Sequence, residues 1–178
     1  MSNTDRPMRA RSFLLLTSFG LSLTACATTP VAVVAPATIP IAAAPGPAPI
    51  AGYDWFYNAS EDEVSLSYGV AESDDVLLDL ACITGTGKLM LLHAAAHDHP
   101  ARIVVESGGD TETYPAETEP SELHDGLFLS ATAPATDPVF QRFRRLGWLA
   151  LLDDEKRQMM AAHPGSEDRI MQFFTACG

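Results

Sequence analysis

From Val64 onward, short apolar runs alternate with clusters of glycine, proline, serine and acidic residues, which favour turns. Runs of this length, separated by turn chemistry, are typical of antiparallel strands. The pattern predicts a mainly β domain with short helices (α+β), folded as a small antiparallel β-sandwich or barrel with a C-terminal helix. The predicted strands span residues 64–70, 76–83, 88–95, 101–109, 126–133 and 147–153.

Two later segments change from a strand pattern to a helical one. Residues 138–146 place Phe140 and Phe143 on one side of a short helix. Ser166 then precedes two acids and is predicted to be the N-cap of a terminal helix over residues 166–177. The apolar stripe that this helix would bury against the sheet comprises Ile170, Phe173, Phe174 and Cys177.

The segment Thr84-Gly85-Thr86-Gly87-Lys88 has the composition of a phosphate-binding loop but not its spacing. Such a loop needs four residues between its glycines and a helix after its lysine. Here one residue separates the glycines, and the next run is a predicted strand. The segment is therefore predicted to be a glycine-rich β-hairpin turn.

The N-terminus resembles a secretion signal. Arg6, Arg9 and Arg11 precede an apolar run over residues 13–25 that several hydroxyl groups interrupt. The run is shorter than the roughly 20 apolar residues that a transmembrane helix needs. Export followed by cleavage is the favoured interpretation.

Leu23-Thr24-Ala25-Cys26 resembles the lipobox of bacterial lipoproteins. The resemblance implies that residues 1–25 form a signal peptide and that Cys26 becomes the lipidated first residue of the mature chain. Two or three acyl chains hold a protein firmly at a membrane, whereas one holds it only marginally. By analogy with enterobacterial sorting, Ala27 implies an outer-membrane lipoprotein facing the periplasm.

Residues 26–51 are predicted to be a tether because they contain six prolines and no charged residue. Another interpretation is that their apolar residues contact a partner or the membrane.

Residues 52–178 are long enough for one domain with its own core and too short for two.

Acidic residues outnumber basic ones, 23 to 11, so the net charge is −12. Removing residues 1–25 would remove three arginines and one aspartate, and the mature chain would then carry −14. This charge disfavours nucleic acid and anionic lipid as partners. It favours solvation in the envelope or, as a more specific alternative, attraction of cations or of a basic partner protein.

Once Cys26 is lipidated, Cys82 and Cys177 are the two cysteines that remain. Because the predicted compartment permits disulfides, they are predicted to form one. Two buried free thiols are the alternative. A redox role is disfavoured because the chain has no CxxC motif.

Three histidines within seven residues, His93, His97 and His99, form a candidate metal site. Imidazoles bind zinc, copper and nickel, and His97 and His99 would project to the same side of an extended backbone. His93 could join them only if the loop folds back. The alternative is a set of exposed loop histidines.

Catalytic patterns are weaker. The chain has no GxSxG or HExxH motif, and Ser107 would need His124 brought to it by tertiary folding. The acidic stretch over residues 111–125 is predicted to be a solvated excursion from the sheet. Trp55 and Trp148 fit either a core or an aromatic binding surface. No catalytic residue and no cofactor is predicted.

These observations favour a non-enzymatic envelope lipoprotein that binds another protein or a cell-wall component. Small lipid-anchored lysozyme inhibitors are similar in size, anchor and β-rich architecture, but their characteristic loop sequence is absent. The late strand, terminal helix and closing cysteine also resemble uncharacterised proteobacterial periplasmic proteins. Metal handling through the three histidines is the alternative function, and hydrolysis is a weaker one.

Overall fold

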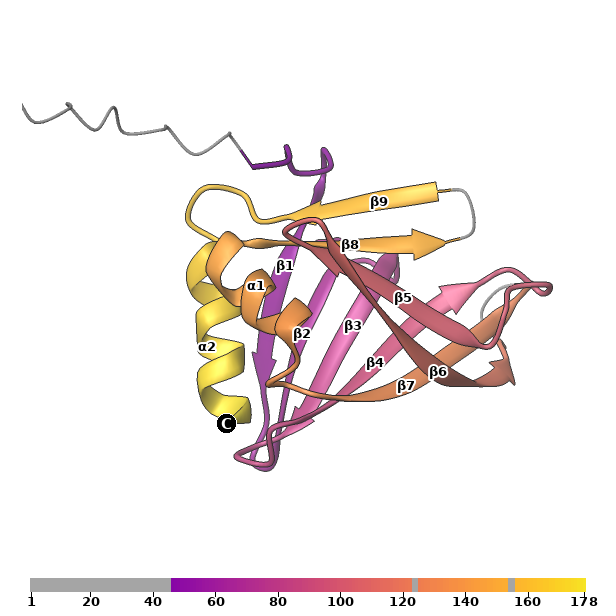
Figure 1. Cartoon of the computed structure of the whole chain (residues 1–178), viewed down its shortest axis with the longest axis horizontal. Coiled ribbons are helices and arrows are strands. Elements are labelled where there is room, and N and C mark those ends of the chain that lie inside the picture. Colours follow the sequence, from indigo (N-terminus) through magenta and orange to yellow (C-terminus); the bar gives the residue numbers. More distant parts are fainter. Residues whose placement is uncertain (1–45, 123–124, 154–155) are drawn as a thin grey trace, which may run out of the picture. The chain divides into compact units, whose positions relative to one another are not determined.

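The apolar runs pair in one strongly curved antiparallel sheet in the computed structural model (Figure 1). The structure describes residues 46–122, 125–153 and 156–178. The predicted signal peptide, the lipobox with Cys26 and most of the predicted tether therefore lie outside the described residues. None of the helices in the described part is long and apolar enough to cross a membrane.

The described residues contain nine strands and two helices, and the sheet has the order β1-β2-β3-β4-β7-β6-β5-β8-β9. Strands β1 to β4 form a meander, and β7 then pairs with β4 in place of β5. The elements are β1 (Tyr53–Ala59), β2 (Glu63–Val70), β3 (Val76–Ile83), β4 (Lys88–Ala95), β5 (Arg102–Ser107), β6 (Asp110–Pro120), β7 (Leu127–Pro134), α1 (Pro138–Leu146), β8 (Trp148–Asp153), β9 (Lys156–Ala161) and α2 (Glu167–Cys177).

The predicted fold class is confirmed, because the protein is a mainly antiparallel β domain with two short helices, one of them C-terminal. Each of the six predicted strands is present within two residues at either end, and α1 coincides with its predicted range. Strands β1 and β9 were not among the predicted strands. The apolar alternation that marks a half-buried strand thus located most of the sheet.

One detail of the sequence prediction was wrong and another was confirmed only in part. The acidic stretch predicted to leave the sheet instead forms β6, because Tyr114 and Ala116 face the core while acids on alternate positions face water. Ser166 occupies the N-cap position of α2, as predicted, but its side chain makes no capping hydrogen bond. Its hydroxyl donates to the Asp54 carboxylate at 2.5 Å instead, and so links the start of α2 to β1.

The sheet curls into a nearly closed barrel in which β1 and β9 are the two edges. Side chains join these edges: the Trp55 indole N–H donates to the Met160 carbonyl oxygen at 3.2 Å. Near this seam Arg169 of α2 donates to the Asp54 carboxylate at 3.0 Å and to the Trp55 carbonyl oxygen at 2.7 Å. The first turn of α2 therefore fastens the β1 edge.

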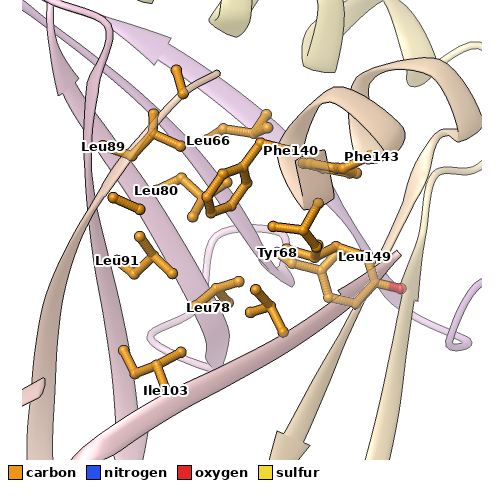
Figure 2. Packing of buried hydrophobic residues seen from close by; sticks show 14 of the residues in the cluster. Leu66, Tyr68, Leu78, Leu80, Leu89, Leu91, Ile103, Phe140, Phe143 and Leu149 are labelled. Carbon is orange, nitrogen blue, oxygen red and sulfur yellow. The ribbon is translucent and has the colours of Figure 1, made fainter. Parts of the chain in front are cut away.

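The core lies on the side of the sheet that we call the inner side, where β2, β3, β4 and β7 bury residues at every second position. Figure 2 shows Phe140 and Phe143 of α1 pointing among the leucines of the sheet. Phe143 also contacts Trp55, with 4.8 Å between ring centroids. Burying a side chain of this size contributes about 1.5–3 kcal/mol. The inner-side leucines of the first strands are Leu66, Leu78, Leu80, Leu89 and Leu91.

The glycine-rich segment predicted to be a hairpin turn connects β3 to β4, as expected, and it also meets the end of α2. The backbone N–H groups of Gly85 and Gly87 donate to the Ala176 and Cys177 carbonyl oxygens at 2.9 and 2.8 Å. These carbonyls have no partner within the helix, so the hairpin satisfies them. Both glycines have positive φ, which explains their use in this turn.

The predicted bond between Cys82 and Cys177 is present, with the two sulfurs 2.02 Å apart. It joins the inner side of β3 to the last residue of α2, next to the hairpin contacts. The C-terminal helix is thereby attached to the sheet at both ends, by Arg169 at the first turn and by the disulfide at the last.

Candidate functional site

The opposite side of the sheet, which we call the outer side, carries a groove of about 670 Å³. It is lined by residues of β2, β3, β4, β6 and β7 and of the β2–β3 turn. These strands are adjacent in the sheet, in the order β2-β3-β4-β7-β6 (Figure 1). We call it the outer groove and define it by the residues that the argument uses: Asp74, Asp79, Leu92, Ala94, Glu119 and Phe128.

Strand register explains why these side chains meet. Asp79 of β3 pairs with Leu92 of β4, and two residues further along β4 Ala94 pairs with Phe128 of β7. Phe128 in turn pairs with Glu119 of β6. Because residues opposite each other in a sheet share a face, these pairs form two rows across the outer side.

Across the two rows taken together the chemical order is acid, apolar, acid, because Asp79 ends one row and Glu119 ends the other. Asp79 lies on the β3 side and accepts a hydrogen bond from the Ser67 hydroxyl. Glu119 lies on the β6 side and is exposed. Between them Leu92 and Ala94 are half-buried and Phe128 is exposed at its edge. The outer groove thus has an apolar floor with a carboxylate on each side.

Further exposed apolar side chains extend this surface along β3 and β4. Met90 is 39% exposed and Ile83 is 60% exposed, and both border a smaller cavity of about 230 Å³ on the outer side. Single exposed apolar residues are ordinary, but a continuous row of them on one face is typical of an interaction surface. The outer groove and this cavity both lie over the outer side of β3 and β4.

Of the three histidines predicted to bind metal, the structure brings two together and places the third elsewhere. His93 on β4 and His99 in the β4–β5 loop are both buried, and their ring centroids lie 6.1 Å apart. His97 lies at the surface, with its Nε2 3.0 Å from the Asp125 carboxylate. The loop does fold back, through a hydrogen bond from the His99 N–H to the Ala96 carbonyl oxygen.

His93 and His99 have different surroundings. Burial lowers the pKa of His93 below its ordinary value, and its Nδ1 lies 2.8 Å from the Leu77 carbonyl oxygen. The Nε2 of His99 lies 3.1 Å from an Asp153 carboxylate oxygen at the end of β8. Within the part of the chain that the structure describes, no three histidine, cysteine or acidic side chains are already gathered as a metal site. Metal binding by the three predicted histidines together stays a prediction.

Ser107, the candidate nucleophile, is buried, and its hydroxyl donates to the Trp148 carbonyl oxygen at 2.9 Å. It holds β5 to β8. His124, its hypothetical base, lies outside the described residues. Trp55 is fully buried in the core, so it belongs to the packing rather than to an aromatic binding surface.

Sequence reasoning missed the residues that define the outer groove and the acid beside His99. Asp79 did leave a signal, since it interrupts the apolar run of β3 and therefore marks the strand's outer side. No sequence pattern marked Glu119, because its place in the groove depends on β6 belonging to the sheet. Asp153 meets His99 only through the tertiary fold.

Comparisons with known proteins leave this surface without a family assignment: no family model, no curated protein and no solved structure matches the chain.

Proposed function

We propose that the protein is a lipid-anchored protein of the cell envelope, in the outer membrane and facing the periplasm, that binds another protein through the outer groove. The lipobox-like Leu23-Thr24-Ala25-Cys26 supports the anchor. The bond between Cys82 and Cys177 supports an oxidising compartment, because disulfides persist there and are rare in the cytosol.

The groove's chemistry selects the class of partner. An apolar floor flanked by Asp79 and Glu119 fits a protein segment that has an apolar residue between lysines or arginines. The net charge of −12 also attracts such a segment at long range. Cell-wall glycan strands with carboxylate-bearing peptides fit less well, since the two groups of carboxylates would repel. The acid, apolar, acid order across the outer groove is the observation that carries the proposal.

A site-specific crosslink in living cells tests the groove. A photo-reactive amino acid replaces Leu92 in the outer groove or, as the matched control, exposed Glu61 in the β1–β2 turn. We expect a discrete protein adduct from position 92 and none of the same mass from position 61. Mass spectrometry of the adduct should identify a segment containing lysine or arginine next to apolar residues. Equal adducts from both positions, or an acidic crosslinked segment, contradict the proposal.

Charge reversal adds a second test of the same groove. Asp74→Lys with Glu119→Lys reverses one acid on each side, whereas Glu61→Lys with Asp62→Lys makes the same change in net charge at the opposite end of β2. The groove pair should reduce the position-92 adduct at least about fivefold. The control pair should leave it within about twofold. An equal loss in both variants would show that net charge alone, rather than the groove, attracts the partner.

The anchor is tested independently of the groove. Cys26→Ser should move the protein from the membrane fraction to the soluble fraction, because the thiol that receives the lipid is gone. Intact-mass analysis of the wild type should show a chain that begins at Cys26 and carries acyl chains. A wild-type chain with an unmodified Cys26 thiol would contradict the anchor and leave the groove to be judged by its own tests.

A further inference from the structure

His93, His99 and Asp153 meet on the inner side, where β4, the β4–β5 loop and the end of β8 come together. The two imidazole rings lie edge to face, with 6.1 Å between centroids and 77° between planes. The Asp153 carboxylate lies 3.1 Å from the His99 Nε2 and is one-fifth exposed. The cluster is therefore buried on the histidine side and borders solvent on the aspartate side.

Both histidines use Nδ1 in the same way. The Nδ1 of His93 lies 2.8 Å from the Leu77 carbonyl oxygen, and that of His99 lies 2.8 Å from the Pro100 carbonyl oxygen. A carbonyl oxygen only accepts, so each Nδ1 carries the hydrogen and each Nε2 is left for another partner. Metal-binding histidines are oriented by this kind of Nδ1–H bond to a backbone carbonyl.

The Nε2 of His93 has no such partner. It is buried, because His93 is only 5% exposed, and it has no hydrogen-bond partner among the described residues. A buried polar atom without a partner is uncommon in a folded protein and costs about 1–3 kcal/mol. This atom therefore points to a ligand that accepts an imidazole lone pair.

The spacing of His99 and Asp153 is close to that of a zinc site, whereas His93 must move before the described residues gather three ligands. Ligands about 2.0–2.1 Å from a tetrahedral zinc ion lie about 3.3 Å from each other. The separation of 3.1 Å between His99 Nε2 and Asp153 Oδ1 matches that value. Two imidazoles on such an ion have centroids about 5 Å apart, so His93 and His99, at 6.1 Å, need to approach by about 1 Å.

We propose that His93 Nε2, His99 Nε2 and an Asp153 carboxylate oxygen bind one divalent transition-metal ion of the zinc type, with His93 moving toward His99 on binding. Imidazole nitrogen with one carboxylate oxygen is a ligand set that zinc takes readily, and water can occupy the fourth position. His97 is not a ligand, because it is exposed and faces Asp125. The site goes beyond the proposed function, and of its three ligands only His93 also lines the outer groove.

Zinc titration of the purified full chain without a histidine tag tests the site. All proteins carry Cys26→Ser, so that no unlipidated thiol competes for the metal, and a chelator removes metal beforehand. Calorimetry with zinc chloride should give one ion per chain. His97→Ala, the matched control, should keep the stoichiometry and an affinity within about twofold. Asp153→Asn and His99→Ala should each weaken binding at least about tenfold.

Cobalt and stability measurements exclude indirect effects. Cobalt bound to the control should give the visible absorption of a tetrahedral site, and Asp153→Asn should lose it. Asp153→Asn preserves shape at a partly exposed position, and an unchanged circular dichroism spectrum verifies its fold. Zinc should raise the melting temperature of the His97→Ala protein but not of Asp153→Asn. No zinc binding by the starting protein, loss of binding in His97→Ala, or undiminished binding in Asp153→Asn overturns the proposal.

Discussion

The two sides of β4 show how one strand serves stability and recognition at once. On the inner side Leu89 and Leu91 are fully buried in the same cluster as Phe140. On the outer side Met90 is exposed and Leu92 is half-buried along the outer groove. The residue types are nearly the same, so apolar character alone does not separate the core from a binding surface. The side of the sheet that the helices cover makes the difference.

The inner side is held by helix packing and a disulfide, whereas the outer side has smaller contacts between strands, such as the hydrogen bond from Ser67 to Asp79. Helix α1 inserts two phenylalanines into the core, and α2 is attached through Arg169 and the disulfide. This division allows residues of the outer groove to vary in chemistry at little cost to folding. Perturbations of the inner side should therefore reduce stability, and those of the outer side should reduce binding.

Breaking the disulfide should have the largest effect on the inner side. Cys82→Ala with Cys177→Ala opens a loop with a sequence separation of 95 residues, and the chain-entropy model gives roughly 4–5 kcal/mol for a loop of about that length. We expect a melting temperature lower by at least about 10 °C in calorimetry. The wild type in strong reductant should show a similar loss. Equal melting temperatures with and without reductant would show that the helix contacts alone hold α2.

The same leucine-to-alanine change on neighbouring residues sharpens the comparison of the two sides. Leu91→Ala leaves a cavity in the core and should lower the free energy of unfolding by about 2–5 kcal/mol. Leu92→Ala on the outer side should cost about 1 kcal/mol or less, because water already reaches its side chain. Urea unfolding measures both. Similar costs for the two variants would mean that another segment covers the outer groove in the native chain.

Much of the fold was predictable because burial alternates along each strand. The run at Val64 repeats apolar residues at every second position, and the runs at Val76 and Lys88 are short, nearly continuous apolar segments bounded by turn residues, so the tertiary fold agrees with the local signal. Strand β9 was missed because its exposed first half, beginning at Lys156, is polar, and its pairing with β8 is a backbone interaction. Strand β6 was missed because its acids and prolines concealed the alternation centred on Tyr114.

The candidate sites were less predictable because they depend on strand order. Spacing suggested that His97 and His99 would act together, but β4 ends at Ala95 and the following turn brings His99 to His93 instead. The outer groove forms because β7 rather than β5 pairs with β4, which places Glu119 across the floor from Asp79. No local pattern encodes that crossover.

Ionisation of Tyr114 at alkaline pH should have the smallest effect on stability among the changes to the inner side. Burial first, and then the hydrogen bond from its hydroxyl to Asp137 at 2.8 Å, raise the pKa of Tyr114 far above its ordinary value of 10.0. The folded protein therefore keeps this proton at pH values where the unfolded chain releases it. Stability from this group is complete below about pH 10 and is lost as the pH rises above that value.

Urea unfolding at pH 8 and pH 10.5 measures this loss. Tyr114→Phe should destabilise by about 1 kcal/mol at pH 8, because one hydrogen bond is lost. It should also lose less further stability on going to pH 10.5 than the wild type does. Asp137→Asn removes the neighbouring charge but not the burial, so its pH dependence should lie between the two. If Tyr114→Phe and the wild type lost stability in parallel, the tyrosine proton would have no part in holding β6 against α1, and the inner side would depend on apolar packing and the disulfide alone.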